Sequence, residues 1–196
     1  MSPNDLNVNE QADHDRSVHD YPHLDLDDDE YVVIDVERSK IGVVFIWVVV
    51  LLIFILVPGA FFLAMNMSPL PDHIKTGLSL ILVLFAIIIL LSGVIARNIY
   101  RANYFIVSNK RVFAKVQHVP FVYRLQMVEL EHVEDVSMAR TSLLQIIFNY
   151  GSIRLSTVGD EHTYKFTFSA DPESQIKIIQ KVVQAVDEGE PTKYRR

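Results

Sequence analysis

The chain has 196 residues and contains no cysteine. This absence excludes disulfide bonds, thiolate nucleophiles and cysteine metal ligands, and it leaves the redox character of the compartment undetermined. The sequence also lacks the motifs typical of enzyme active sites. It has no HExxH zinc motif, no glycine-rich phosphate loop and no nucleophile elbow. We therefore predict a protein that is not an enzyme and that needs no cofactor.

Acidic and histidine side chains do not assemble into a recognisable catalytic or metal-binding pattern either. Glu129 and Glu131 are spaced to share one face of a strand, but a solvated strand face explains this arrangement better than a pair of catalytic carboxylates. No metal site is predicted for the dispersed histidines. The groups considered are Glu129, Glu131, Glu134 and Asp135, together with His14, His19, His23, His118, His132 and His162.

Charge is absent from two long apolar runs, which dominate the sequence. Ile41 to Ala64 has 24 residues and Thr76 to Ala96 has 21, and neither contains an ionisable side chain. A helix needs roughly 20 apolar residues to cross a bilayer. A core helix of a soluble protein would carry polar residues on its solvent face, and most of each run has none. The runs predict a transmembrane helical hairpin over residues 41–96.

The residues that flank these runs predict an orientation. Arg38 and Lys40 precede the first run, and Arg97 and Arg101 follow the second. Basic residues favour the cytoplasmic side of short flanking segments. We therefore expect a two-span protein of the cell membrane with both termini in the cytoplasm. Because an ionisable group within a span would mark a transport path, its absence favours an anchor over a transporter.

The net charge of −6 conceals a marked asymmetry. Residues 1–37 carry 12 acidic residues and one basic residue, for a net charge of −11, whereas the remaining residues have a net charge of +5. Residues 1–23 have few apolar side chains and no periodicity, and they predict a disordered acidic tail. We expect residues 24–40 to form a juxtamembrane segment, in which the β-branched residues within Tyr31–Val36 predict a strand that pairs with another part of the chain. The basic excess of the remainder is too small to favour nucleic acid as a partner.

The segment after the second run switches to the two-residue periodicity of strands. Residues 102–189 predict a small antiparallel domain of about six or seven strands that ends in an amphipathic helix, and residues 190–196 predict a tail. Asp171 and Pro172 are suited to begin that helix. The LLQIIF stretch within residues 142–150 predicts a short helix. The expected strands are Tyr104–Val107, Val112–Val116, Val119–Gln126, Val128–Val136, Ser152–Val158 and Thr163–Phe168.

Three stretches, NYFIVSNKRVFAKV, VELEHVEDVSMARTSLLQIIFNYGSIRLSTVGD and FTFSADPESQIKIIQKVV, resemble the bacterial pleckstrin-homology-like (PH-like, DUF304-type) membrane proteins. In these proteins a two-helix membrane segment precedes the domain. The resemblance covers about residues 30–188. It implies an α+β membrane protein whose PH-like barrel or sandwich of about seven strands carries a C-terminal helix on the cytoplasmic side. It implies no catalytic activity and names no ligand.

Two functional hypotheses follow for the domain. In the first, the basic residues Lys110, Arg111, Lys115 and Arg124 dock it on anionic membrane lipids, which attract each basic residue by about 1 kcal/mol. In the second, the domain is an assembly module that binds a protein partner or a second copy at a strand edge or beside its last helix. The acidic tail could fold back on the basic face and compete with lipid.

Overall fold

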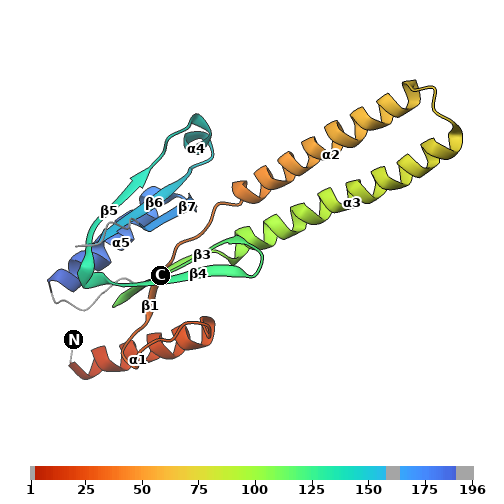
Figure 1. The fold of residues 1–196 in the computed structure, drawn as a ribbon. Coiled ribbons are helices and arrows are strands. Elements are labelled where there is room, and N and C mark those ends of the chain that lie inside the picture. The colour runs from red at the N-terminus through yellow and green to blue at the C-terminus, as the bar shows by residue number, and fades with distance from the viewer. Residues whose placement is uncertain (1–2, 158–163, 189–196) are drawn as a thin grey trace. The chain divides into compact units, whose positions relative to one another are not determined.

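The computed structural model describes residues 3–157 and 164–188 (Figure 1). The described chain divides into two compact units. The sheet unit comprises residues up to 39, residues 103–116 and residues from 123 onward; the helical unit comprises Lys40–Ala102 and Gln117–Val122. The predicted domain over 102–189 therefore also includes a segment that precedes the apolar runs.

The helical unit contains two long helices, α2 (Ile41–Met67) and α3 (Asp72–Ala102). Both predicted apolar runs lie inside these helices. The helices extend past the runs because polar residues at helix ends can remain helical, and the connection shortens to residues 68–71. Only 11% of the most apolar stretch of either helix is buried. The helices are long and apolar enough to cross a membrane, and their exposed apolar surface is atypical of core helices in a soluble protein.

Two glycines mark the contact between α2 and α3. A Cβ atom added at Gly42 of α2 would overlap the ring of Tyr100 in α3, and one added at Gly93 of α3 would lie 3.0 Å from Val50. Small residues at a helix interface let the two backbones approach closely. The described helices therefore pack on each other through specific positions.

The sheet unit is a sandwich of two antiparallel sheets with a C-terminal helix. The first sheet has the order β1-β2-β3-β4 and the second the order β5-β6-β7. The strand predicted over Tyr31–Val36 is present as β1 and pairs with β2. The elements are β1 (Val32–Asp35), β2 (Tyr104–Ser108), β3 (Arg111–Val119), β4 (Val122–Glu129), β5 (Val133–Ala139), β6 (Tyr150–Thr157), β7 (Tyr164–Ala170) and α5 (Pro172–Asp187).

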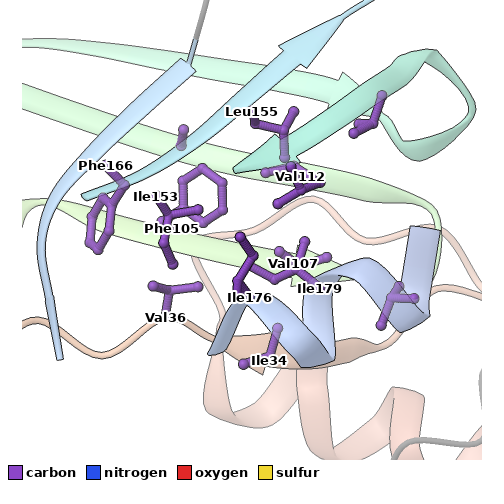
Figure 2. Close-up of a cluster of buried hydrophobic side chains, with 14 of the residues drawn as sticks. Ile34, Val36, Phe105, Val107, Val112, Ile153, Leu155, Phe166, Ile176 and Ile179 are labelled. Atoms are coloured by element: carbon purple, nitrogen blue, oxygen red, sulfur yellow. The ribbon is translucent and has the colours of Figure 1, made fainter. Parts of the chain in front are cut away.

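The hydrophobic core lies between the sheets and α5. Figure 2 shows side chains of β1, β2, β6 and α5 gathered in one cluster. The rings of Phe105 and Phe166 lie 5.5 Å apart in this cluster. Ile179 and Val182 of α5 have no exposed surface, and burying a side chain of this size contributes about 1.5–3 kcal/mol. The amphipathic pattern predicted for the last helix is thus the one that closes the core.

The strand predicted over Val128–Val136 is two strands separated by a single 3₁₀ turn, η1 (Leu130–His132). Leu130 is fully buried, and its N–H group donates to the carbonyl of Lys110 at 2.8 Å. This contact ends β4 and carries the chain from the first sheet to the second. Leu130 and Val133, on either side of this break, are both buried in the core.

The N-terminal segment contains a helix, α1 (Pro3–Asp20). This differs from the disorder predicted for residues 1–23, because long-range contacts hold its last turns. The Ser17 hydroxyl accepts a hydrogen bond from the N–H group of Val32 at 2.9 Å, and a ring nitrogen of His14 lies 2.7 Å from the Glu30 carbonyl oxygen. Leu24 then packs on Ile106 and Phe113. None of these contacts has a local signal in the sequence.

Candidate functional site

The predicted lipid-binding residues do not form one basic patch. Lys110 lies in the turn between β2 and β3, Arg111 is the first residue of β3, Lys115 lies further along β3, and Arg124 lies on β4. Lys110 and Arg111 both face the acidic segment that precedes β1. The structure therefore divides the set into two residues in ion pairs and two outside them.

Arg111 forms an ion pair with Glu30, whose side chain is fully buried. Its Nε atom donates to one carboxylate oxygen of Glu30 at 3.1 Å, and its Nη2 atom donates to the other. The Ser108 hydroxyl donates to the first oxygen at 2.5 Å, and the N–H group of Asp27 donates to the second at 3.2 Å. The buried carboxylate is thus fully surrounded by donors, as a buried charge requires.

Lys110 and Asn109 extend this contact along the acidic segment. The ammonium group of Lys110 lies 2.5 Å from a carboxylate oxygen of Asp29. Asn109 and Tyr31 exchange two hydrogen bonds: the Asn109 side-chain oxygen accepts from the Tyr31 N–H group at 2.9 Å, and the Asn109 N–H group donates to the Tyr31 carbonyl at 3.0 Å. We call residues 25–31 the acidic strap, because they cover the turn over residues 108–111.

The pKa values reflect the pairing of strap and turn. Burial raises the pKa of Glu30, but hydrogen bonds from Arg111, Ser108 and Asp27 outweigh burial and hold that pKa below its ordinary value. Hydrogen bonding between Lys110 and Asp29 raises the pKa of the lysine and lowers that of the aspartate. All these groups stay charged at neutral pH. The two basic residues of the turn are therefore neutralised by carboxylates of the same chain.

Lys115 and Arg124 are placed differently. The Lys115 ammonium lies over two aromatic rings, 4.7 Å from the centroid of Tyr123 and 5.6 Å from that of Tyr104. Arg124 is exposed on β4. Among the described side chains, which cover residues 10–157 and 164–188, neither has a carboxylate partner within 4.0 Å. Unlike Lys110 and Arg111, these two side chains are therefore not paired with carboxylates of the described part of the chain.

The residues predicted to flank the membrane also have distinct environments. Arg38 belongs to the sheet unit, where its guanidinium group donates to the Thr167 carbonyl at 3.2 Å and lies 5.1 Å from the centroid of the Phe166 ring. Lys40 is exposed at the start of α2. Arg97 and Arg101 lie in the last turns of α3. The structure thus assigns Arg38 a packing role in addition to its charge.

The described residues offer no catalytic constellation. They contain no group of three or more histidine or acidic residues placed to hold a metal ion. Glu129, Glu131, Glu134 and Asp135 are exposed, and the nearest pairing among these is Glu129 with His132 at 3.3 Å. A hollow of about 200 Å³ between α1 and β1 is smaller than the roughly 300–1,000 Å³ typical of ligand sites.

The loop between β5 and β6 exposes apolar side chains, which the sequence pattern does not predict. It contains the short helix α4 (Leu143–Ile147), which agrees with the helix predicted for this stretch. Leu143 is 78% exposed and Ile147 is 71% exposed. The LLQIIF stretch, in which apolar residues occupy nearly every position, indicates the helix but not the exposure of its side chains. The exposed members of the loop are Leu143, Leu144, Ile146, Ile147 and Phe148.

Two antiparallel sheets packed as a sandwich and a C-terminal helix that covers their core define the chain as a PH-like protein. A sequence model described as Bacterial PH domain matches residues 32–183, and the chain belongs to this family. The match confirms the resemblance seen in the sequence, and it includes both apolar helices.

The chain is similar in fold to part of a crystal structure of a DUF1696 family protein with a pleckstrin-homology domain from Shewanella loihica PV-4. The sequence identity is 14% and the TM-score is 0.31, and the similarity covers 42% of this chain and 68% of that chain. No curated protein matches the chain.

Proposed function

We propose that the protein is a non-enzymatic binding or scaffold module that α2 and α3 anchor in the cell membrane, with its PH-like sheet unit on the cytoplasmic face. The observation that carries this proposal is the pair of long apolar helices with almost no buried surface. The connectors to the sheet unit are short: α3 ends at Ala102 and β2 begins at Tyr104. A tether of this length holds the unit at the bilayer surface.

The basic flanks support the orientation. Lys40, Arg97 and Arg101 lie at the ends of the helices that adjoin the sheet unit in sequence, whereas the opposite end carries one basic residue, Lys75, balanced by Asp72. Extraction of membranes at alkaline pH tests the anchoring. The full chain is expected to stay in the membrane pellet, because each helix presents apolar surface to lipid. Release of the intact chain into the supernatant would contradict the anchoring.

Strand β4 supports a role in binding another polypeptide. It is the terminal strand of the first sheet and is exposed along most of its length. Tyr123, Leu125 and Met127 are apolar or aromatic side chains on this exposed edge. An exposed edge strand with apolar side chains pairs readily with a strand from another chain. Photo-crosslinkers at Leu125 should capture a partner in native membranes, and the same probe at Lys177 of α5 is the control. Equal capture at both positions would contradict this role.

A second candidate function is docking on anionic lipid through Lys115 and Arg124, with Lys110 and Arg111 contributing when the acidic strap moves away. The absence of carboxylate partners around Lys115 and Arg124 in the described structure favours this candidate. Lipids that co-purify with the full chain in mild detergent test it. Anionic lipid should be enriched, and Lys115→Glu with Arg124→Glu should remove the enrichment while Lys177→Glu should not. Unchanged lipid in the double variant would rule this function out.

A further inference from the structure

The exposed apolar loop around α4 has a defined conformation that hydrogen bonds at the start of the helix stabilise. Ser142 caps the helix: its side chain accepts a hydrogen bond from the N–H group of Gln145, while the Gln145 side chain accepts from the N–H group of Ser142. Gln145 is the only polar residue between Ser142 and Asn149. Because the cap engages its side chain, the outer surface of the loop is apolar.

The base of the loop is held by polar contacts. Arg140 donates to the side-chain oxygen of Asn149 at 2.7 Å, which joins the two ends of the loop. Asn149 has a φ of 48°, a left-handed conformation that asparagine tolerates better than most residues. Its carbonyl accepts a hydrogen bond from the N–H group of Asp171 at 2.9 Å. The apolar side chains are therefore presented in a defined conformation.

The loop leaves the sheet unit beside the point where the chain continues to α2. Tyr150, the first residue of β6, pairs with Ala170 of β7, and the N–H group of Ala170 donates to the carbonyl of Glu37 at 2.8 Å. The N–H group of Ser39 donates to the carbonyl oxygen of Phe168 at 2.6 Å. The rings of Phe168 and Tyr150 are stacked, with their centroids 5.2 Å apart. Strands lie about 5 Å apart. The base of α4 and residue 39, two residues before α2 begins, are thus near neighbours within the sheet unit.

The charge around the loop suits a lipid surface. No acidic residue lies between Arg140 and Tyr150 in the sequence. At the base of the apolar tip, Arg140 and Asp171 both bond to the side chain of Asn149, at 2.7 Å and 3.3 Å, so a basic and an acidic group offset each other there and the tip itself carries no charge. Peripheral segments that bind membranes combine apolar side chains at the acyl boundary with basic side chains at the level of the headgroups. A tether to the same bilayer raises the effective concentration of lipid at the loop, so a small apolar area suffices for binding.

From these observations we propose that the α4 loop inserts Leu143, Leu144 and Ile147 into the interfacial layer of the bilayer that α2 and α3 span. The proposal rests on the membrane anchoring proposed above. It gives the sheet unit a second point of attachment, which limits its rotation about the short connectors. Insertion also removes the apolar side chains of the loop from water. Left in water, they would form an exposed apolar patch that favours aggregation.

The lack of native cysteine allows a direct test with single-cysteine variants of the full chain. Ile147→Cys reports on the loop, Leu84→Cys on the middle of α3, and Lys177→Cys on an exposed position of α5. Each variant is labelled with an environment-sensitive fluorophore and reconstituted into vesicles whose lipids carry bromine on the acyl chains. All three positions are exposed, so the substitutions should not disturb folding.

We expect brominated lipid to quench the fluorophore attached at position 84 and the one attached at position 147. The fluorophore at position 177 should not be quenched. The fluorophore at position 147 should be quenched more by bromine on the part of the acyl chain near the headgroup than by bromine near the bilayer centre. If Leu84 is quenched and Ile147 behaves like Lys177, the insertion is wrong while the anchoring stands. If Ile147 is shielded from aqueous iodide without being quenched by bromolipid, a protein covers the loop and the insertion is wrong. If Leu84 is not quenched, the anchoring itself is wrong and the insertion falls with it.

Discussion

Glu30 is the residue on which the contact between the acidic strap and the turn depends. Its carboxylate is fully buried and accepts hydrogen bonds from Arg111, Ser108 and the N–H group of Asp27. Removing one member of a buried ion pair leaves the other charge without compensation. We expect Glu30→Ala to lower the free energy of unfolding of the sheet unit by about 3 kcal/mol.

Hydrogen exchange of β2 and β3 amides in the detergent-solubilised full chain measures this loss, because exchange from protected strands reports the free energy of opening. Glu134→Ala, at an exposed carboxylate of β5, is the matched control and should change exchange little. The double variant Glu30→Leu with Arg111→Leu should recover part of the loss, because an apolar pair avoids the desolvation of both charges. Equal protection in Glu30→Ala and the control would contradict the importance of the pair.

The depressed pKa of Glu30 predicts how stability depends on pH. Its folded pKa lies below the ordinary value of 4.5. A carboxylate of this kind contributes stability that is complete above its unfolded pKa and is lost as pH falls through the folded pKa. Protection of β2 and β3 should therefore hold near neutral pH and decline below about pH 4.5. In Glu30→Gln this part of the decline should disappear; a profile identical to that of the parent chain would refute the assignment.

At the scale of elements, the contact between α2 and α3 makes a distinct prediction at Gly42. Alanine normally stabilises a helix by about 1 kcal/mol over glycine. A Cβ atom at Gly42 would overlap the Tyr100 ring, whereas one at Gly59 of the same helix has no neighbour within 4 Å. Gly42→Ala should lower the thermal midpoint of the hairpin in detergent, and Gly59→Ala should leave it unchanged or raise it.

Trp47 provides the readout for this comparison, since it is the single tryptophan of the chain and lies on α2 near Gly93. Its fluorescence follows separation of the helices during heating. Adding Tyr100→Ala to Gly42→Ala should restore part of the midpoint, because the overlapping ring is then absent. If Gly42→Ala and Gly59→Ala behave alike, the helices do not pack as described.

Elements with a strong local pattern were predictable from the sequence. Both apolar helices, most strands and α5 follow from runs or periodicities that need no knowledge of distant residues. The break at η1 was missed because its cause, the hydrogen bond from Leu130 to Lys110, joins residues 20 positions apart. Helix α1 was missed for a similar reason, since Ser17 and His14 contact residues near β1.

The candidate site was predictable only in part. The sequence identifies Lys110 and Arg111 as basic and residues 25–30 as acidic, but Arg111 and Glu30 are 81 positions apart and nothing local indicates that they pair. The exposure of the α4 loop was also not predictable, because an apolar stretch of this length is equally compatible with a buried position. Local patterns therefore identify elements, while the pairing of distant charges and the exposure of apolar residues require the fold.

At the scale of the whole molecule, the order of elements ties the PH-like unit to the apolar helices. Strand β1 precedes α2, and strand β2 follows α3, so the helical hairpin is inserted between two paired strands of one sheet. Both connections to the hairpin therefore leave from the same sheet. A unit attached through two short connectors has less freedom than one on a single linker, which suits the proposed role of holding a binding surface at the membrane.

Labelling of single cysteines with a membrane-impermeant maleimide in intact cells tests this account most directly. Ser68→Cys lies in the connection between α2 and α3, and Lys177→Cys lies on α5 of the sheet unit. We predict that Ser68→Cys is labelled in intact cells and that Lys177→Cys is labelled only after permeabilisation. Labelling of Lys177→Cys in intact cells, or protection of both positions until permeabilisation, would contradict a cytoplasmic module anchored by a two-span hairpin.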